Sequence, residues 1–131
     1  MNDQERDAFL RLPLTAVLST VDRAGRVHSV PVWFRWDGEA ARIVTGRTSA
    51  KMHNIARTGR ATLCVDQREG SMRYVTMEGP VEVVDPLTRD ERLALRSQYQ
   101  DPAEAEKIVA RGGHEEMVLL ILRPEHWLTM G

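Results

Sequence analysis

The segment from Thr45 to Lys51 contains the side chains best suited to binding an anion. It reads Thr-Gly-Arg-Thr-Ser-Ala-Lys and joins an expected strand to an expected helix. Ser49 or Thr48 should cap that helix, and the backbone N–H groups at the positive end of the helix dipole then lack partners. Lys51 in the first turn opposes the dipole, which makes sense if an anion binds there. We predict a phosphate site at this helix start; the alternative is a solvated lysine beside an ordinary cap.

A second segment, Val30–Phe34, offers backbone and aromatic surface to a planar ligand. Pro31 removes a donor from the strand ladder, so strand pairing should open there. The backbone groups freed around Pro31 and Val32 can face a heterocycle, with the indole of Trp33 as aromatic surface. The alternative is an edge strand that ends in a core Phe34.

The remaining chemistry-bearing side chains give weaker signals. Asn54 lies about one turn beyond Lys51, on the same side of the helix, and joins the candidate site. Cys64 lies within an apolar strand, where a small buried side chain is expected, and a nucleophilic role would need a neighbouring cation or helix end. The four histidines show no metal-ligand spacing and are expected at surface or capping positions: His28, His53, His114 and His126. No GxGxxG or P-loop spacing is present, and no metal site is predicted.

Composition restricts the classes to which the chain can belong. Among 131 residues, 42% are hydrophobic and 28% charged, and 18 basic against 19 acidic side chains give a net charge of −1. That balance excludes the basic excess of a nucleic-acid binder. The longest apolar run, Met117–Leu122, is far shorter than the ~20 residues of a membrane helix. A charged start at Met1–Arg11 and a lone cysteine favour the cytoplasm, and the length predicts a single domain over residues 1–131.

The hydrophobic pattern predicts short strands with helices inserted between them. Strands are expected over Thr15–Val21, Val27–Trp36, Arg42–Thr45, Arg60–Val65, Met72–Val84 and Met117–Arg123. Helices are expected between Asn2 and Pro13, over Thr48–Thr58, over Thr88–Gln100 and from Pro102 to Gly112-Gly113, with Pro124–Gly131 as a tail. Thr88 has capping-box spacing to Glu91, and Asp37-Gly38 is typical of a hairpin turn. Such a chain is mainly β and fits an antiparallel barrel or a sandwich.

Five segments, by their order and spacing, carry a resemblance to a known family. They are Ala16–Asp22 followed by Gly25-Arg26, Val30–Phe34 with Asp37-Gly38, Thr45–Lys51 with Asn54, Arg60–Asp66 and Arg73–Glu82. Together they resemble the flavin-binding split-barrel family, the pyridoxamine 5′-phosphate oxidase-like proteins. The resemblance implies a six-stranded antiparallel split β-barrel and a homodimer with cofactors in the grooves between subunits. It also matches Lys51 to the lysine that holds the cofactor phosphate, with Ser49 and Thr45 beside it. Pro31 and Val32 match backbone that lies against the ring system.

The chain departs from the oxidase itself in two substrate-binding elements. The oxidase has Arg-x-x-x-x-Lys on its second strand, whereas here Arg35 stands for the lysine and Ser29 or Val30 takes the place of the arginine. The oxidase tail continues into an Arg-Leu-His segment, whereas this sequence ends at Gly131. We therefore expect a substrate other than pyridoxamine phosphate. The Ser-Ala-Lys-Met-His-Asn run at 49–54 is similar to the helix start of the branch that uses the deazaflavin coenzyme F420.

The resemblance implies an oxidoreductase that passes a hydride from bound coenzyme F420 to an unsaturated organic small molecule. FMN is the alternative cofactor, and a non-catalytic carrier or a heme- or tetrapyrrole-binding barrel is the alternative class. The candidate cofactor-binding residues are Pro31, Val32, Trp33, Thr45, Gly46, Arg47, Ser49, Lys51 and Asn54. No general acid is identified. We expect a homodimer, because the apolar Met117–Leu122 and the aromatic side chains exceed what one small barrel should cover. Neither nucleic acid nor membrane is an expected partner.

Overall fold

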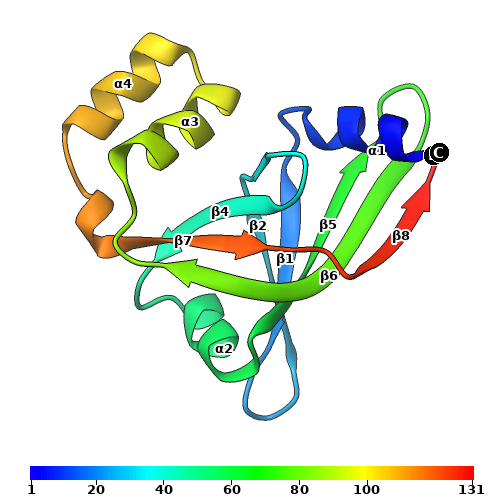
Figure 1. The fold of residues 1–131 in the computed structure, drawn as a ribbon, viewed down its shortest axis with the longest axis horizontal. Helices are drawn as coiled ribbons and strands as arrows, with labels where there is room; N and C mark the ends of the chain where they lie inside the picture. The colour runs from blue at the N-terminus through cyan, green and yellow to red at the C-terminus, as the bar shows by residue number, and fades with distance from the viewer.

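The computed structural model describes all 131 residues as a curled antiparallel sheet with helices around it (Figure 1). The helices are α1 (Asp3–Leu10), α2 (Ala50–Thr58), α3 (Arg89–Tyr99) and α4 (Pro102–Ala110), with a 3₁₀ turn η1 (His114–Glu116). The strands are β1 (Ala16–Val21), β2 (Val27–Val32), β3 (Arg35–Trp36), β4 (Ala41–Gly46), β5 (Arg60–Gln67), β6 (Arg73–Val84), β7 (Met117–Leu122) and β8 (His126–Met130). The predicted mainly β architecture is confirmed, as a half-barrel with more strands than predicted.

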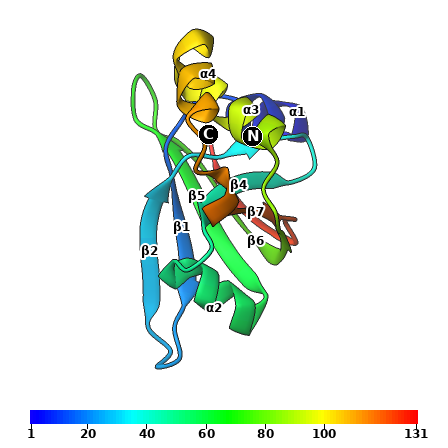
Figure 2. The same cartoon turned by 90° about the vertical axis from the view of Figure 1, so that its left-hand side faces the viewer.

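The strand order is β2-β1-β5-β6-β7-β4-β3, with β8 also paired to β6. β2 and β3 follow each other along the chain but lie at opposite ends of this order. The chain itself therefore links the two edges of the curled sheet. In Figures 1 and 2, α2 covers one end of the half-barrel and α1 lies at the other end, near both termini. Helices α3 and α4 stack on each other beside the sheet.

Two expectations about strands were wrong. The single strand expected over Val27–Trp36 is broken at Trp33-Phe34 into β2 and β3, since the backbone N–H of Phe34 binds the Tyr99 hydroxyl instead of a neighbouring strand. The expected tail contains β8, which continues β7 along the same edge of β6. Pro124 interrupts the two, because it has no backbone N–H to donate.

Gly79 allows β6 to run beneath the crossing from β7 to β8. A Cβ atom at this position would lie 2.1 Å from the backbone oxygen of Arg123, which is far inside contact distance. On either side of this crossing, Arg123 N–H donates to the Pro80 carbonyl and Glu125 N–H to the Glu78 carbonyl. A side chain at Gly79 would separate the strands that close this part of the core.

The core lies inside the curl and extends through β7 to a second, smaller cluster. Alternate residues of β1, β5 and β6 face inward; Leu18, Leu63 and Met77 are buried there. β7 is covered on both faces, because Leu120 faces the main core while Leu119 packs in the smaller cluster. The apolar run Met117–Leu122 is thus used within the chain, so it does not indicate a dimer interface as we expected.

Side-chain caps define the helix boundaries. Asn2 forms a complete capping box with Glu5 at the start of α1, and Ser49 and Asp101 cap α2 and α4. The expected box at α3 is half formed: the Thr88 hydroxyl accepts a hydrogen bond from Glu91 N–H, while the Glu91 side chain is used elsewhere.

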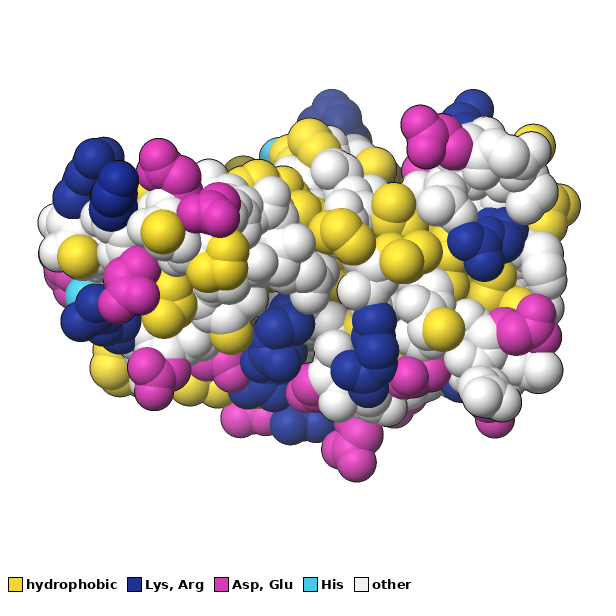
Figure 3. All heavy atoms as spheres, turned by 90° about the horizontal axis from the view of Figure 1, so that it is seen from above, with side chains coloured by type: hydrophobic (Ala, Val, Ile, Leu, Met, Phe, Trp, Pro, Cys, Tyr) yellow, Lys and Arg dark blue, Asp and Glu magenta, His cyan; other side chains and the backbone are white.

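Seen from above, the α3–α4 lobe carries charges of both signs, and apolar side chains gather between this lobe and the α1 end (Figure 3). None of the helices has the length and apolar character needed to cross a bilayer.

Candidate functional site

A pocket of about 350 Å³ forms where the ends of β2 and β4, the first turn of α2 and one side of α3 meet. Its lining contains most of the predicted cofactor-binding residues together with side chains that were not predicted. The predicted members are Pro31, Val32, Trp33, Thr45, Gly46 and Lys51. The others are Val44, Arg92, Leu95, Arg96 and Met117. Segments far apart in the sequence therefore meet at one place.

The start of α2 holds a cap and a free cation. Ser49 is the N-cap, and its hydroxyl accepts a hydrogen bond from Met52 N–H and lies 3.1 Å from the Thr45 hydroxyl. The backbone N–H groups of Ala50 and Lys51 precede the first intrahelical hydrogen bond and have no partner within the helix. Lys51 is half-buried and forms no hydrogen bond or ion pair. This helix start therefore offers N–H groups and a positive charge to an anion.

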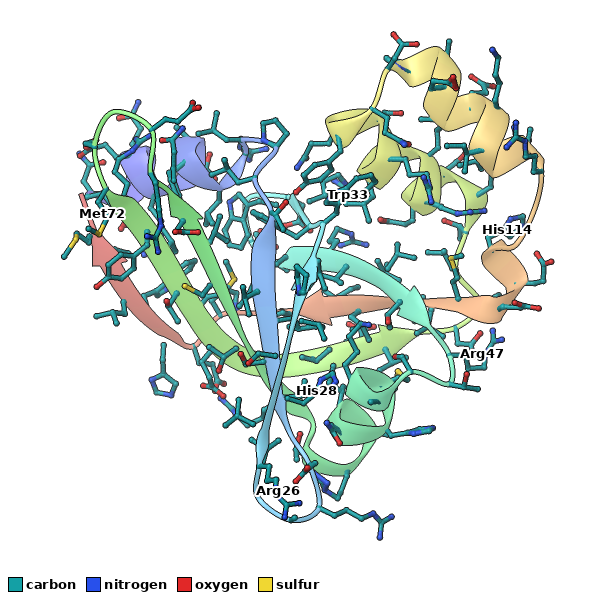
Figure 4. The ribbon with its side chains drawn as sticks, turned by 180° about the vertical axis from the view of Figure 1, so that it is seen from behind. Arg26, His28, Trp33, Arg47, Met72 and His114 are labelled. Atoms are coloured by element: carbon teal, nitrogen blue, oxygen red, sulfur yellow. The ribbon has the colours of Figure 1, made fainter.

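The strand break presents Trp33 to the pocket. Its ring stacks on Tyr99 with the centroids 4.7 Å apart and the planes 3° from parallel. The Tyr99 hydroxyl donates to the Leu14 carbonyl at 2.7 Å and accepts a hydrogen bond from Phe34 N–H, so Tyr99 is fixed. Trp33 keeps 37% of its surface exposed and also lines a smaller hollow with Thr15, of about 280 Å³. Figure 4 shows Trp33 at the foot of α3, between that helix and the strand ends.

Helix α3 supplies two arginines that sequence reasoning missed. Arg92 is buried, with 6% of its surface exposed, and donates one hydrogen bond of 2.8 Å to the Gly112 carbonyl. Arg96, one turn later, donates to the Gln100 side-chain oxygen and lies 6.0 Å from the centroid of the Trp33 ring. Burial lowers the pKa of Arg92, the positive charge of Arg96 lowers it further, and the Glu115 carboxylate only partly opposes them. Their spacing of four residues places them on one helix face, which was the available sequence signal.

The position of α3 is set by Glu91, which lies next to Arg92 in sequence. The Glu91 carboxylate accepts hydrogen bonds from Arg35 at 3.2 Å and from Arg42 Nε at 2.9 Å. Arg42 also pairs with Asp37 at 3.0 Å. At the other end of α3, the Gln98 amide donates to the Phe34 carbonyl at 2.8 Å. These contacts join α3 to the β3–β4 hairpin and so hold Arg92 and Arg96 over the pocket.

The charge of the pocket is one-sided. Lys51, Arg92 and Arg96 line it, and none of them forms an ion pair with a carboxylate. No acidic side chain is among the lining residues. Like charges concentrated in a partly desolvated space repel one another, so an anionic ligand would relieve an unfavourable interaction.

Arg47, a predicted cofactor-binding residue, does not line this pocket. Its guanidinium forms two hydrogen bonds with the Asp85 carboxylate, of 2.9 and 2.7 Å, and a third with the Glu115 carbonyl. The hydrogen bonds with Arg47 lower the pKa of Asp85, and Asp85 raises that of Arg47. In Figure 4 Arg47 lies beside the turn from β4 to α2, on the side where His114 lies. Arg47 therefore joins the turn before α2 to the loop after β6.

Asn54 also lies away from the pocket. Its buried amide donates a 3.1 Å hydrogen bond to the Thr20 hydroxyl, which fixes α2 against β1. It lines a larger hollow of about 890 Å³ beside the β1–β2 turn, together with charged residues such as Asp22 and Arg57. That hollow has only two apolar lining residues and no buried cation, so it fits a flavin-type ligand less well than the smaller pocket does.

The cysteine and the histidines lie outside the pocket. Cys64 is half-buried on the outward face of β5, in a shallow hollow with Tyr74 and Leu128, and is not the fully buried side chain we expected. It alternates with the buried Leu63 and Val65, so the strand period places it outward. His53 and His126 are exposed. Nowhere do three side chains of the His, Cys, Asp or Glu type come together as a metal site requires.

The match between the sequence and a family model decides the relationship. The model for pyridoxamine 5′-phosphate oxidase matches residues 3–131. The chain belongs to the pyridoxamine 5′-phosphate oxidase family. This family includes oxidoreductases and flavin-binding proteins, and its members are typically dimeric. Membership confirms the resemblance inferred from the sequence. No curated protein sequence matches the chain.

Solved structures show the same fold. An F420 reductase superposes with a TM-score of 0.79 at 25% identity, covering 93% of this chain and 94% of that one. A conserved hypothetical protein of Mycobacterium tuberculosis gives 0.85 at 20% identity, over 98% and 84%. A heme storage protein of Vibrio cholerae gives 0.71 at 15% identity, over 95% and 92%. The last two likenesses concern the fold alone.

The residues present fit the phosphate and ring of a flavin-type cofactor. The free cation and N–H groups at the α2 start suit a phosphate, because hydrogen bonds to a charged acceptor are short and strong. Arg92 adds a further positive charge to the pocket lining, which also suits a negatively charged ligand. On the other side, Pro31, Val32 and Trp33 provide an apolar and aromatic wall for a planar ring.

Proposed function

We propose that this chain is an oxidoreductase that binds the deazaflavin coenzyme F420 and reduces an unsaturated organic small molecule. The observation that carries the proposal is the single pocket in which the Pro31–Trp33 wall meets Lys51 at the α2 start. The likeness to an F420 reductase at 25% identity supports the deazaflavin over FMN. When bound, the reduced deazaflavin would supply the hydride.

In this proposal the protein binds, orients and excludes water. Lys51 and the α2 N–H groups hold the cofactor phosphate, with Thr45, Gly46 and Ser49 shaping the turn around it. Backbone at Pro31 and Val32 lies against the ring. No carboxyl, imidazole or phenol group of this chain lines the pocket, so the chain offers no general acid there.

The pocket of one chain holds only part of such a cofactor. A volume of about 350 Å³ lies at the low end of the range for sites that enclose a drug-sized ligand, and F420 is larger than that. The smaller hollow across Trp33 continues the surface past Pro31. We propose that a second subunit closes the groove and that the protein acts as a homodimer.

The outward face of the sheet supports the dimer. The strand register places Val17, Cys64, Thr76 and Leu128 in one row across β1, β5, β6 and β8. Leu128 is 60% exposed and Val17 42%, with Met130 nearby at 46%. Exposed apolar side chains gathered in this way are typical of a protein–protein interface. This face, and not β7, is the candidate for subunit contact.

The dimer has a direct test. Sedimentation of the wild type should give twice the mass of one chain at micromolar concentration. Leu128→Asp places a charge in the proposed contact and should give the monomer with an unchanged circular dichroism spectrum. A wild-type monomer that still binds the cofactor fully would contradict the dimeric site.

Two fluorescence titrations test which cofactor the protein binds. The purified protein is titrated separately with F420 and with FMN, and binding is followed by the fluorescence of each. We expect F420 to bind more tightly, and we expect chemically reduced F420 on the protein to be reoxidised when an enone or a quinone is added and accepts the hydride. Tight FMN binding without F420 binding would assign the alternative cofactor. Binding of F420 with no turnover of any substrate would indicate a carrier.

A further inference from the structure

Arg92 is a buried cation that forms no ion pair, although the Glu115 carboxylate is near enough to favour its charged form. It is the one charged side chain among the buried residues, and a single hydrogen bond to the Gly112 carbonyl uses one of its donors. A guanidinium carries five N–H donors, and those of Arg92 that do not bind Gly112 are accessible in the pocket that the residue lines. A cation held in a partly desolvated space without an ion pair is unfavourable, and an anionic ligand would compensate it.

Its neighbours add to the positive charge. Arg96 lies on the same face of α3, and it donates a hydrogen bond to the neutral amide of Gln100. Lys51 reaches the pocket from α2, so the cations come from two different helices. The acidic residue beside them in sequence, Glu91, is turned toward Arg35 and Arg42. The fold thus directs the carboxylate of Glu91 away from these cations.

We infer that this pocket binds a molecule with two separate anionic groups. The first lies on Lys51 and the start of α2, and the second, a carboxylate or phosphate, lies on the pair Arg92 and Arg96. The α2 start has enough donors of its own for one anion: Lys51 and two free backbone N–H groups. The guanidinium groups of α3 form a separate set, and their planar forks match a carboxylate or phosphate bidentately.

This inference rests on the proposed function and extends it to the ligand class. FMN carries one phosphate, whereas F420 carries a phosphate and an acidic glutamate tail, so a second anion site favours F420. The second group has two sources: the tail of the cofactor, or a carboxylate on the substrate. Both present the same chemistry to Arg92 and Arg96, and the experiment separates them.

The test compares F420 and FMN binding to variants of α3. Arg96→Gln removes a half-buried charge, and Arg92→Lys keeps the buried charge but loses the fork. Each should weaken F420 binding by about tenfold or more, the loss expected for a charged hydrogen bond, and leave FMN binding within a few-fold. Arg89→Gln is the matched control, because Arg89 is exposed on the same helix and does not line the pocket. Its affinities should equal those of the wild type.

Four outcomes decide the source of the second anion and the inference itself. A selective loss of F420 affinity assigns the second anion to the cofactor tail. Unchanged F420 affinity with a raised KM for a carboxylate-bearing substrate, at unchanged kcat, assigns it to the substrate. Equal losses for F420 and FMN would put all the cations on one phosphate, and no change in any of these quantities would leave the α3 arginines without a ligand. Either of these last results overturns the inference.

A third measurement does not depend on a flavin. Pyrophosphate, with two linked anionic groups, should raise the melting temperature of the wild type and of Arg89→Gln more than an equal concentration of inorganic phosphate does. The difference should disappear in Arg96→Gln. If neither F420 nor FMN binds the wild type, the proposed function fails, and the pyrophosphate result alone then supports or overturns the two-anion pocket.

Discussion

Helix α3 separates two groups of basic side chains that have opposite surroundings. Toward the β3–β4 hairpin, Arg35 and Arg42 meet Glu91, and Arg42 also meets Asp37. Toward the pocket, the arginines of α3 and Lys51 form no ion pair, and Glu115 acts on Arg92 only at a distance. The two groups are close in space, since Glu91 and Arg92 are consecutive residues. They differ only in whether the chain supplies the anion.

The difference indicates what each group does. Charges that the chain neutralises itself hold secondary structure elements together, and their contribution appears as folding stability. Charges that the chain leaves unpaired make no such contribution and repel one another, so they are retained for a ligand. Replacing a residue of the first group should therefore lower stability, whereas replacing one of the second should lower affinity.

The largest expected effect is on cofactor binding by Lys51→Ala. A partly sheltered, charge-assisted contact with phosphate contributes roughly 1.5–3 kcal/mol, so F420 affinity should fall about 10- to 150-fold. The melting temperature without ligand should stay level or rise, because a first-turn lysine opposes the helix dipole. Fluorescence titration and thermal melts measure the two quantities.

Lys107→Ala is the control for this change. Lys107 is the only other lysine and lies exposed on α4, away from the pocket. Its removal should change neither affinity nor the ligand-induced rise in melting temperature. A loss of less than threefold for Lys51→Ala would place the phosphate elsewhere and make Lys51 a surface residue.

The next effect concerns the paired group, which is Arg35 and Arg42 with their carboxylate partners. Glu91→Gln keeps the shape of the side chain but removes the charge that Arg35 and Arg42 share. Its carboxylate is 20% exposed, so its hydrogen bonds to the two guanidiniums are partly sheltered. We expect the free energy of unfolding to fall by about 1–3 kcal/mol, measured in urea at neutral pH.

Glu106→Gln on the exposed side of α4 is the matched control and should leave stability unchanged. A double-mutant cycle with Arg35→Gln then isolates the pair, and the two losses should be less than additive. Equal stability of Glu91→Gln and the wild type would mean that charge pairing does not hold α3. In that case the paired charges do not contribute to folding stability, and this difference between the two groups of basic side chains disappears.

Local signals in the sequence identified the ends of the helices better than they identified the candidate site. The caps at Asn2, Ser49 and Asp101 and the glycine that ends α2 at Gly59 were predictable, because each depends on a few adjacent residues. The family resemblance is likewise carried by local segments. β8 was missed because its five residues follow a proline and pair with the distant β6. Such pairing depends on tertiary contacts, which a short alternating pattern does not specify.

The site was predicted on its strand and α2 sides and missed on its α3 side. The charged side chains of α3 are typical of a solvated helix face, and only the packing shows that Arg92 is buried while Arg89 is exposed. Arg47 illustrates the converse error. Its place in the candidate loop suggested a ligand contact, but Asp85, distant in sequence, takes its guanidinium. Which cations have acidic partners is decided by long-range contacts.

The smallest expected effect is the pH dependence of folding stability that comes from Asp37, which pairs with Arg42. Burial alone would raise the pKa of this carboxyl, but hydrogen bonds from the Glu39 and Ala40 N–H groups and from Arg42 outweigh it and lower the pKa below the usual 3.8. A lowered carboxyl pKa contributes stability that is fully present above the unfolded-state value and is lost as pH falls through the folded-state value. Asp37→Asn should therefore be less stable than the wild type at neutral pH, by up to about 1 kcal/mol, because the pair with Arg42 remains partly open to solvent.

Urea unfolding at a series of pH values checks this expectation. The stability gap between wild type and Asp37→Asn should be constant from neutral pH down to about pH 5 and should narrow as pH falls toward about 3, where the wild-type carboxyl begins to take up a proton. Glu39→Gln, on the same turn, forms no ion pair and should show no such narrowing. A gap that stays constant down to the acid limit would mean that Asp37 acts only through its neutral hydrogen bonds. The charge of Arg42 would then be balanced by Glu91 alone, and the paired group would be smaller than the structure indicates.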